Sequence, residues 1–287
     1  MSAFSFTVAI AGVTIRFISP RLMEIPLELR PFLTDADEVQ ESYEIVLLEQ
    51  PLELKGKPVF VSCRQAVYAE EDGSTRVFLL MKAPDGCMPA CRLRSNGKNT
   101  LYLPASDWGR YEKRCKLSVI LGAEALFLRH NGMILHSSVV RCHGEAVLFS
   151  GSSGAGKSTQ AELWRRFRNA EILNGDRCII VQRGDRFFGC GSPYSGSSGI
   201  YRPDEAPIRA VVLPQKASEN RIVRLERNQA FRRLYREMIG NLWDVAYTEK
   251  LLDLLNALLL RVPVYCLYCR PEEQAVELTW QTVFGGK

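Results

Sequence analysis

The chain has 287 residues, of which 46% are hydrophobic and 24% charged, and its net charge is +5. This composition is typical of a globular protein and excludes a disordered, collagen-like or low-complexity chain. At roughly 150 residues per domain, the length corresponds to one large domain or two modest ones. The excess of basic residues, 37 Lys and Arg against 32 Asp and Glu, is too small to indicate nucleic-acid binding.

Two features of the sequence indicate a cytosolic protein. The longest apolar runs fall far short of the ~20 residues that a membrane span needs, and the N-terminus lacks the pattern of a signal peptide. Nine cysteines without a secretory signal favour reduced thiols over a disulfide framework. Cys266 and Cys269 lie in a strand-like run, where residues i and i+3 point to opposite faces. Their spacing to Cys87 and Cys91 matches no common zinc pattern, so we expect no thiolate metal site.

Residues 1–105 are predicted to form a β-rich N-terminal region. The run at 4–10 alternates with the period of a strand, and two further runs flank an Asp72-Gly73 turn. An exposed sheet edge in this region would suit the binding of an extended substrate or leader peptide by strand addition. From 107 to about 129 the pattern becomes helical. We expect the domain boundary between 105 and 130, and this helix is compatible with either domain.

Residues 106–287 are predicted to form a second domain, which we expect to be catalytic. Its predicted elements are strands at 134–142 and 145–150, a helix at 157–168, strands at 171–173, 178–182, 186–190 and 208–213, helices at 228–242 and 248–260, a strand at 263–269 and a helix at 271–283. A polar, glycine-rich loop at 191–199 interrupts this series, and its composition excludes it from a hydrophobic core.

A second glycine-rich loop lies between the predicted strand 145–150 and the predicted helix 157–168. It matches the G-x-x-x-x-G-K-[ST] pattern of a P-loop in full, in the strand–loop–helix setting that the pattern requires. Backbone N–H groups of such a loop cradle phosphate oxygens, and the helix N-terminus adds partial positive charge. The sequence therefore predicts a nucleoside triphosphate site formed by Gly151, Ser152, Ser153, Gly154, Ala155, Gly156, Lys157, Ser158 and Thr159.

Phosphoryl transfer also requires an acidic group for the metal and normally a base for the acceptor. Asp176 ends the strand that follows the P-loop helix, at the carboxyl edge of the sheet, where an acidic metal ligand is expected. The alternative is that Asp176 is a turn residue after Asn174-Gly175, without a role in the site. Lys157 is expected to reach the β and γ phosphates, and the Ser158 hydroxyl to ligate Mg²⁺. His136 lies in an apolar strand, where a lone histidine is more often a core residue than a catalyst.

Leu135-His136, the P-loop and the acidic strand end at 174–177 together resemble the catalytic domain of HPr kinase/phosphorylase over about 130–180. That family is similar to the P-loop core of phosphoenolpyruvate carboxykinase. The resemblance implies an α+β, mixed α/β fold in which the P-loop lies between antiparallel strands of a mixed sheet. The full layout resembles HPr-kinase-like proteins of bacterial peptide-modification gene clusters, in which a β-rich region precedes the kinase domain and a serine is phosphorylated.

The resemblance also implies roles for individual residues. The P-loop would bind ATP, and Ser158 and Asp176 would hold Mg²⁺. His136 would pair with the Asp176 carboxylate, and Lys157 would stabilise the transferred phosphate. Arg202 falls near a family arginine that contacts phosphate, although an ordinary surface arginine fits equally well. Arg177 fits either a phosphate contact or a salt bridge.

One departure concerns the base. The family usually carries two adjacent aspartates at the strand end, and here the first of them is Gly175. Either Asp176 serves both metal and base, or another carboxylate supplies the base; candidates are Asp185, Asp204 and Glu205. The loop at 191–199 suits either a lid or acceptor-binding loop or a solvent loop.

The sequence thus predicts an ATP- and Mg²⁺-dependent kinase that phosphorylates a hydroxyl, most readily a serine of a peptide or protein. One alternative keeps the fold and takes a small molecule such as free serine as acceptor. A second is a nucleotide-binding regulatory module with little turnover, which the missing aspartate favours. We expect neither a nucleic-acid nor a membrane partner, and the oligomeric state stays open.

Overall fold

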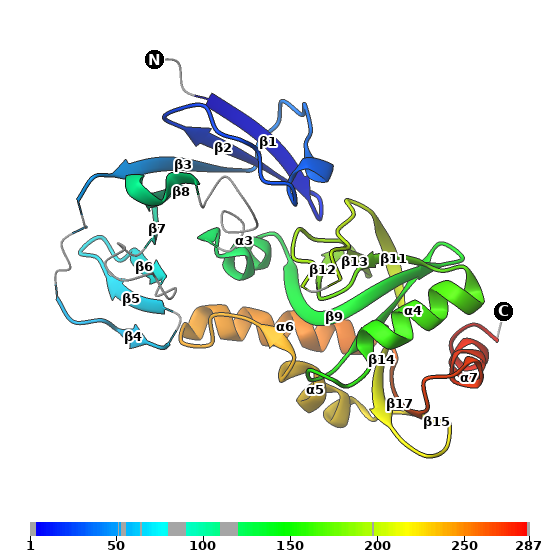
Figure 1. Cartoon of the computed structure of the whole chain (residues 1–287). Coiled ribbons are helices and arrows are strands. Elements are labelled where there is room, and N and C mark those ends of the chain that lie inside the picture. The colour runs from blue at the N-terminus through cyan, green and yellow to red at the C-terminus, as the bar shows by residue number, and fades with distance from the viewer. Residues whose placement is uncertain are drawn as a thin grey trace. The chain divides into compact units, whose positions relative to one another are not determined.

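A computed structural model describes residues 4–50, 52, 56–63, 65–79, 90–109, 120–196 and 198–285. Residue contacts divide the chain into two compact units, Met1–Ala123 and Glu124–Lys287. The fold is mixed α+β, with one mixed sheet in each unit (Figure 1). No helix in the described parts of either unit is long and apolar enough to cross a membrane.

The first unit is built on an eight-stranded sheet with the order β1-β2-β3-β8-β7-β6-β5-β4. Its strands are β1 (Phe4–Ile10), β2 (Val13–Ser19), β3 (Glu41–Leu48), β4 (Phe60–Val61), β5 (Gln65–Ala69), β6 (Thr75–Leu79), β7 (Ala90–Ser95) and β8 (Lys98–Pro104), with short 3-10 helices η1 (Arg30–Phe32) and η2 (Ala105–Asp107). The β2–β3 and β3–β8 pairs are parallel and the others antiparallel. The predicted strand at 4–10 and the hairpin around Asp72-Gly73 are both confirmed.

The predicted helix at 107–129 is wrong in extent. Gly122 has a φ of 64°, a left-handed conformation that ends a right-handed helix. A separate helix, α3 (Ala123–Arg129), begins at the next residue. Cys87 and residues 110–119 of the predicted helix lie outside the described residues.

The second unit contains nine strands and four helices beyond α3, counted over its described residues. The strands are β9 (Gly132–Cys142), β10 (Glu145–Ser150), β11 (Glu171–Asn174), β12 (Arg177–Arg183), β13 (Arg186–Cys190), β14 (Glu205–Lys216), β15 (Arg221–Arg224), β16 (Met238–Ile239) and β17 (Val264–Cys269). The helices are α4 (Lys157–Arg168), α5 (Arg227–Tyr235), α6 (Val245–Arg261) and α7 (Glu273–Phe284). Most predicted elements are confirmed to within a few residues.

Two long strands connect the parts of this second sheet. The strand β9 pairs with β12 and β16 over its first half, and with β10 and β11 over its second half. The strand β14 pairs in turn with β13, β10 and β17. In Figure 1, β9 bends along its length between these two sets of partners. The end of β10 and the start of β12 pair with adjacent β9 residues, Ser150 with Ser137 and Arg177 with His136, so the two ends lie close together.

The strand before the P-loop, β10, has one antiparallel neighbour and one parallel neighbour. It pairs with β9 in an antiparallel hairpin and with β14 in parallel. The predicted hairpin and mixed sheet are therefore confirmed, whereas an antiparallel strand on both sides of the P-loop strand is wrong. The hairpin turn consists of His143 and Gly144, both with positive φ, which suits a two-residue connection.

Hydrophobic side chains pack on both faces of the sheet because alternate residues of a strand point to opposite sides. On one face, Leu148 and its neighbours pack against α5 and α6. On the other face, Phe149 packs against Trp164 of α4, which in turn packs against Phe284 of α7. The P-loop helix is thereby held against the strand that precedes it.

The predicted helix at 228–242 is wrong in its second half. The helix α5 ends at Tyr235, and the chain then forms β16, which pairs with β9. Gly240 and Asn241 follow directly, and both are residues that terminate helices. The residue just before this short strand, Glu237, belongs to the candidate site.

The cysteine pair of β17 behaves as expected for a strand. Arg233 donates to the Cys266 sulfur, whereas Gln160 of α4 donates to the Cys269 sulfur, so the two thiols lie on opposite faces. Burial raises the pKa of Cys269, which keeps that thiol protonated. Among the described residues, no group of His, Cys, Asp and Glu side chains is arranged to hold a metal ion by itself.

Candidate functional site

The P-loop connects β10 to α4 through a tight backbone turn. Gly156, the residue before α4, has a φ of 102°, a conformation that side chains rarely tolerate. The Lys157 ammonium is buried and donates to the carbonyl oxygens of Gly151 at 2.7 Å and Ser152 at 3.1 Å. The lysine therefore lies across the loop, whereas the Ser158 side chain is exposed.

Burial sets the ionisation of this lysine. Desolvation lowers the pKa of Lys157, while the nearby carboxylates of Glu237 and Asp176 raise it. Two acidic side chains therefore lie within electrostatic reach of the P-loop lysine.

His136 reaches the P-loop through the β9–β10 hairpin. The register pairs Ser150, the last residue of β10, with Ser137, so His136 lies level with the first P-loop residue. The Ser150 hydroxyl donates to the His136 carbonyl oxygen at 3.0 Å and fixes this alignment. The His136 side chain is 30% exposed, so it belongs to an open site rather than to the core.

Asp176 reaches the same place from the other side of β9. The β9–β12 register pairs His136 with Arg177, and the preceding Asp176 carboxylate lies 3.3 Å from His136 Nε2. The hydrogen bond with His136 lowers the pKa of Asp176, burial opposes it, and the positive charges of Arg177 and Lys157 lower it further. Asp176 is thus held as a carboxylate between an imidazole and two cationic side chains.

A second carboxylate, Glu237, completes the group. Its Oε2 lies 3.4 Å from His136 Nδ1, and its backbone carbonyl accepts a hydrogen bond from the His136 N–H at 2.9 Å. The His136 ring therefore has a carboxylate at each nitrogen. Sequence reasoning missed Glu237 because it placed the residue inside a helix; the helix-terminating pair Gly240-Asn241 is the signal that points to a different structure.

The loop at 191–199 is anchored to the strand end that carries Asp176. The Asn174 side-chain amide donates to the carbonyl oxygens of Ser192 at 3.0 Å and Tyr194 at 3.1 Å. Its oxygen accepts from the backbone N–H groups of Asp176 at 2.9 Å and Arg177 at 2.8 Å. The buried Asn174 amide therefore holds in place both the loop and the turn that positions Asp176.

The loop then passes directly over the turn that carries Gly175 and Asp176. A Cβ built on Gly175 would lie 2.2 Å from the Ser198 hydroxyl oxygen, and one on Gly196 would lie 2.7 Å from the Asp176 carboxyl carbon. Gly191 to Tyr194 are buried, whereas Gly196, Ser198 and Gly199 are exposed. The interpretation as a free solvent loop is wrong for its first half, because that half is packed into the structure.

Arg177 has a local role in this arrangement. Its Nε lies 3.5 Å from Asp176 Oδ2, and its guanidinium lies over the Tyr194 ring at 5.5 Å from the centroid. These contacts match the salt-bridge alternative for Arg177 and place its charge beside the site.

The other residues that the sequence suggested lie in different pairs. Arg202 is half-exposed and pairs with Glu171 at 3.8 Å, next to Arg141 on β9 rather than next to His136. The three candidate bases also have arginine partners: Asp185 pairs with Arg261, Asp204 with Arg141 and Glu205 with Arg183. Glu237 is the additional carboxylate that the structure places against His136.

The chemistry of these side chains fits a magnesium nucleotide. A hydroxyl and a carboxylate, supplied by Ser158 and Asp176, are oxygen ligands of the kind that Mg²⁺ takes in nucleotide sites. Gly154, in the middle of the loop, is exposed, and a Cβ there would meet nothing within 4 Å. The four side chains of Lys157, Asp176, His136 and Glu237 can together bind anionic phosphate and accept a proton.

Comparisons with known proteins give a distant structural likeness. No protein-family model matches the chain, and no curated protein matches it. A solved structure of the HPr(Ser) kinase/phosphatase from Coxiella burnetii is similar with a TM-score of 0.30 and 12% sequence identity, over 53% of this chain and 93% of that one. These values assign neither a fold nor a function to the chain.

Proposed function

We propose that this protein is an ATP- and Mg²⁺-dependent kinase that transfers the γ-phosphoryl group to the hydroxyl of a serine in a peptide or protein. The observation that carries the proposal is the position of His136 between the carboxylates of Asp176 and Glu237, level with a complete P-loop. A P-loop alone implies nucleotide binding; this group adds a proton acceptor for the attacking hydroxyl.

Each residue has a definite task in this reaction. The Lys157 ammonium balances charge on the β and γ phosphates, and the imidazole–carboxylate pair of His136 and Asp176 takes the proton from the serine hydroxyl. The serine oxygen then forms the new bond to the γ-phosphorus, and the bond to the ADP oxygen breaks. Glu237 orients the His136 ring through its other nitrogen. Mg²⁺ on Ser158 and Asp176 would neutralise phosphate charge.

The openness of the site supports a macromolecular acceptor. His136 and Asp176 are 30% and 28% exposed, and the exposed half of the 191–199 loop lies beside them. A small-molecule kinase would be expected to enclose its acceptor, because a small substrate must be held mostly by buried polar groups. An extended peptide needs only a surface that presents one hydroxyl to the carboxylate.

Transfer of labelled γ-phosphate from ATP tests the proposal. The acceptors are a panel of serine-containing peptides and free serine, and Lys157→Ala and Asp176→Asn serve as inactive variants. We expect label on a peptide from the wild-type protein and a loss of at least about 10²-fold in both variants, because each removes a charge from the reacting group.

Two outcomes would contradict the proposal in different ways. Label on free serine and on no peptide would establish the small-molecule kinase. Binding of ATP, with no acceptor labelled under any condition, would establish the nucleotide-binding regulatory module instead.

A further inference from the structure

A buried and an exposed serine hydroxyl lie against the turn that carries Gly175 and Asp176. Ser138 of β9 is fully buried, and its hydroxyl donates to the Gly175 carbonyl oxygen at 3.0 Å. Ser198 of the 191–199 loop is exposed, and its Oγ would lie 2.2 Å from a Cβ built on Gly175. Of these two hydroxyls, the one of Ser198 is accessible to a nucleotide bound at the surface.

The loop that carries this serine is attached at both ends to Asn174, two residues before Asp176. The Asn174 side-chain amide donates to the carbonyl oxygens of Tyr194 at 3.1 Å and Ile200 at 3.4 Å. The backbone of Tyr201 then forms an isolated β-bridge with Asn174. The exposed tip of the loop between these points is therefore tied to the turn that positions Asp176.

The tip lies beside the group that would accept a proton from a hydroxyl. A Cβ built on Gly196 would lie 2.7 Å from the Asp176 carboxyl carbon, so the loop backbone runs against that carboxylate. The charge of Lys157 lowers the pKa of Asp176, which places the P-loop lysine within electrostatic reach of the same carboxylate. A serine hydroxyl, a proton acceptor and the phosphate-binding lysine thus belong to one region of the structure.

The contacts of the Ser198 hydroxyl are local to the loop. It donates to the Ser195 carbonyl oxygen at 2.6 Å and accepts from the Ile200 N–H at 3.2 Å. Rotation about the Cα–Cβ bond lets an exposed serine exchange one such partner for another acceptor. Gly196 and Gly199, which flank it, have no side chain that would keep a phosphate away.

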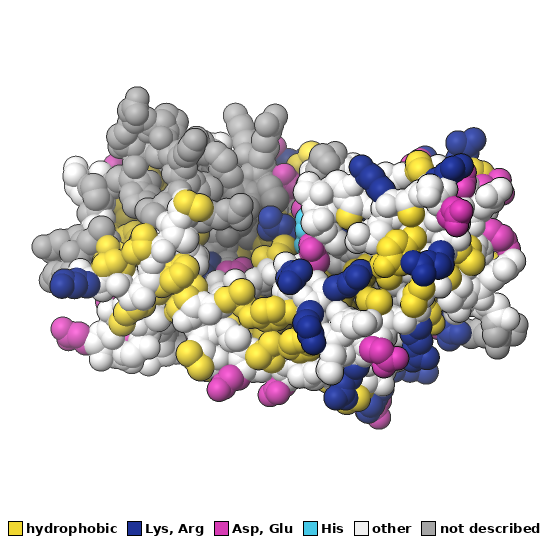
Figure 2. All heavy atoms as spheres, turned by 90° about the horizontal axis from the view of Figure 1, so that it is seen from below, with side chains coloured by type: hydrophobic (Ala, Val, Ile, Leu, Met, Phe, Trp, Pro, Cys, Tyr) yellow, Lys and Arg dark blue, Asp and Glu magenta, His cyan; other side chains and the backbone are white. Residues whose placement is uncertain are grey.

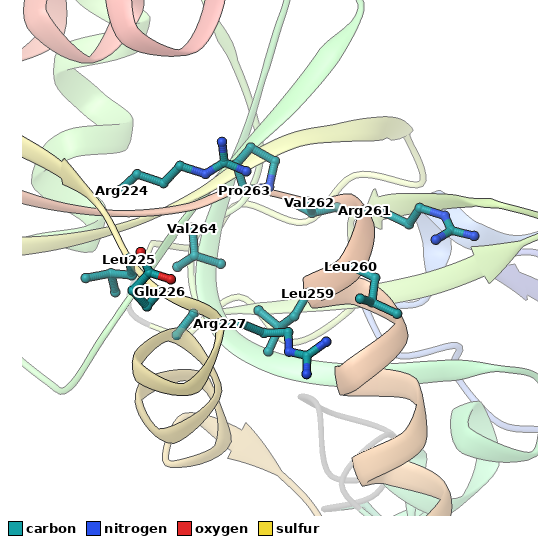
Figure 3. Close-up of a pocket in the computed structure, with 11 residues that line it drawn as sticks. Arg224, Leu225, Glu226, Arg227, Leu259, Leu260, Arg261, Val262, Pro263 and Val264 are labelled. Carbon is teal, nitrogen blue, oxygen red and sulfur yellow. The ribbon is translucent and has the colours of Figure 1, made fainter.

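The hollow between the start of α5 and the end of α6 offers no comparable acceptor. It has a volume of about 360 Å³, and the described residues that line it include three arginines but no serine, threonine or tyrosine (Figure 3). Lys and Arg side chains are also spread among hydrophobic ones on the face of the molecule seen from below (Figure 2). The hollow therefore has basic side chains but no hydroxyl that could receive a phosphoryl group.

We propose that Ser198 is a phosphorylation site and that the candidate active site of the same chain modifies it. The inference rests on the proposed function, because it uses the same ATP and the same proton acceptor. The Ser198 hydroxyl gives its proton to the imidazole–carboxylate pair of His136 and Asp176, and its Oγ forms a bond to the γ-phosphorus. The bond between the γ-phosphorus and the β–γ bridging oxygen breaks, and ADP leaves with that oxygen.

Mass spectrometry of the intact protein tests this proposal. The protein is treated with a phosphatase, freed of it and incubated with ATP and Mg²⁺; we expect a gain of one phosphoryl group, which peptide mapping assigns to Ser198. Ser198→Ala should abolish this gain, whereas Ser195→Ala, a matched change in the same loop, should retain it. Lys157→Ala should abolish it too, because the lysine balances charge on the transferred group.

Transfer within one chain has a kinetic signature. Because the loop is attached beside the site, the first-order rate constant of labelling should not depend on protein concentration. In a mixture, the wild-type protein should not label Lys157→Ala, which retains Ser198 but cannot transfer phosphate. Labelling of Lys157→Ala by the wild-type protein would contradict transfer within the chain.

Ser198→Thr separates a chemical effect from a folding defect in Ser198→Ala. It retains a hydroxyl at the same position, and mapping should find phosphothreonine there. A label on a different residue of the wild-type protein, or an equal gain in the wild-type protein and Ser198→Ala, would overturn the proposal.

The transfer assay with added peptides distinguishes this inference from the proposed function. Label on a peptide with none on Ser198 would overturn the inference and leave the proposed kinase in place. Label on Ser198 with none on any peptide would support the inference and overturn a kinase for peptide or protein acceptors. Label on neither would overturn both.

Discussion

At the scale of single residues, the unusual feature is a histidine with a carboxylate at each ring nitrogen. One carboxylate, Asp176, also faces Lys157 and Arg177, so its negative charge is already balanced by cations. The other, Glu237, is 16% exposed and lies on the far side of the ring. Such an arrangement fixes the orientation of the imidazole, because rotating the ring would break both contacts.

Glu237→Gln tests this orienting role. The amide keeps the size of the side chain and removes its charge, so we expect kcat for peptide phosphorylation to fall about tenfold or more while the KM for ATP changes little. Steady-state kinetics provide the measurement, and Glu237→Asp should retain part of the activity. Glu205→Gln, which alters a carboxylate paired with Arg183 instead, is the control. A rise in the KM for ATP with an unchanged kcat would contradict the role.

At the scale of elements, the loop at 191–199 and the turn at Gly175 are fitted to each other. The Ser198 side chain occupies the space that a side chain at position 175 would need. The loop therefore leaves no room for a side chain at position 175.

Gly175→Ala should therefore displace the loop. The added methyl group would overlap Ser198, and we expect a loss of about 1–3 kcal/mol in the free energy of unfolding, with reduced kinase activity. Gly175→Ala/Ser198→Gly removes the overlap and should restore much of both. Thermal unfolding and the transfer assay are measured for Gly175→Ala, for Ser198→Gly and for the double variant, which together form a double-mutant cycle. If the double variant is as impaired as Gly175→Ala, the loop is not what selects glycine here.

The end of α5 is the second element that matters. The helix stops at Tyr235, and the two residues of β16 then pair with β9 beside His136. The end of α5 thereby places Glu237 against His136.

At the scale of the whole molecule, the second unit is held together by the two long strands that several partners share. Because β9 pairs with β10 and with β12, the P-loop and Asp176 are fixed to one strand. A nucleotide bound there contacts elements from across the unit, so binding should stabilise the folded state as a whole.

Addition of ATP and Mg²⁺ should consequently raise the melting temperature. A ligand at 100 times its Kd adds about 2.7 kcal/mol to the stability of the native state, which corresponds to a shift of about 5–10 °C for a unit of this size. Differential scanning fluorimetry measures the shift. It should be lost in Lys157→Ala and reduced when EDTA removes the metal. An equal shift in Lys157→Ala would show that the nucleotide binds elsewhere.

Local sequence patterns determined much of this protein. The P-loop, the His143-Gly144 hairpin and the helix at 157–168 follow from glycine placement and hydrophobic period, and those properties act between residues close in the chain. The same local patterns singled out His136 and Asp176, and the pairing of their side chains was expected from a family resemblance that rests on the surrounding motifs.

Only the tertiary structure decided the rest of the candidate site. Glu237 reaches His136 because a two-residue strand pairs with β9, and the energy of that pairing comes from a partner about a hundred residues away in the chain. The fit of Ser198 against Gly175 likewise depends on segments that are apart in sequence. Hydrophobic period shows which face of an element is buried, and it carries no information about which distant element will cover it.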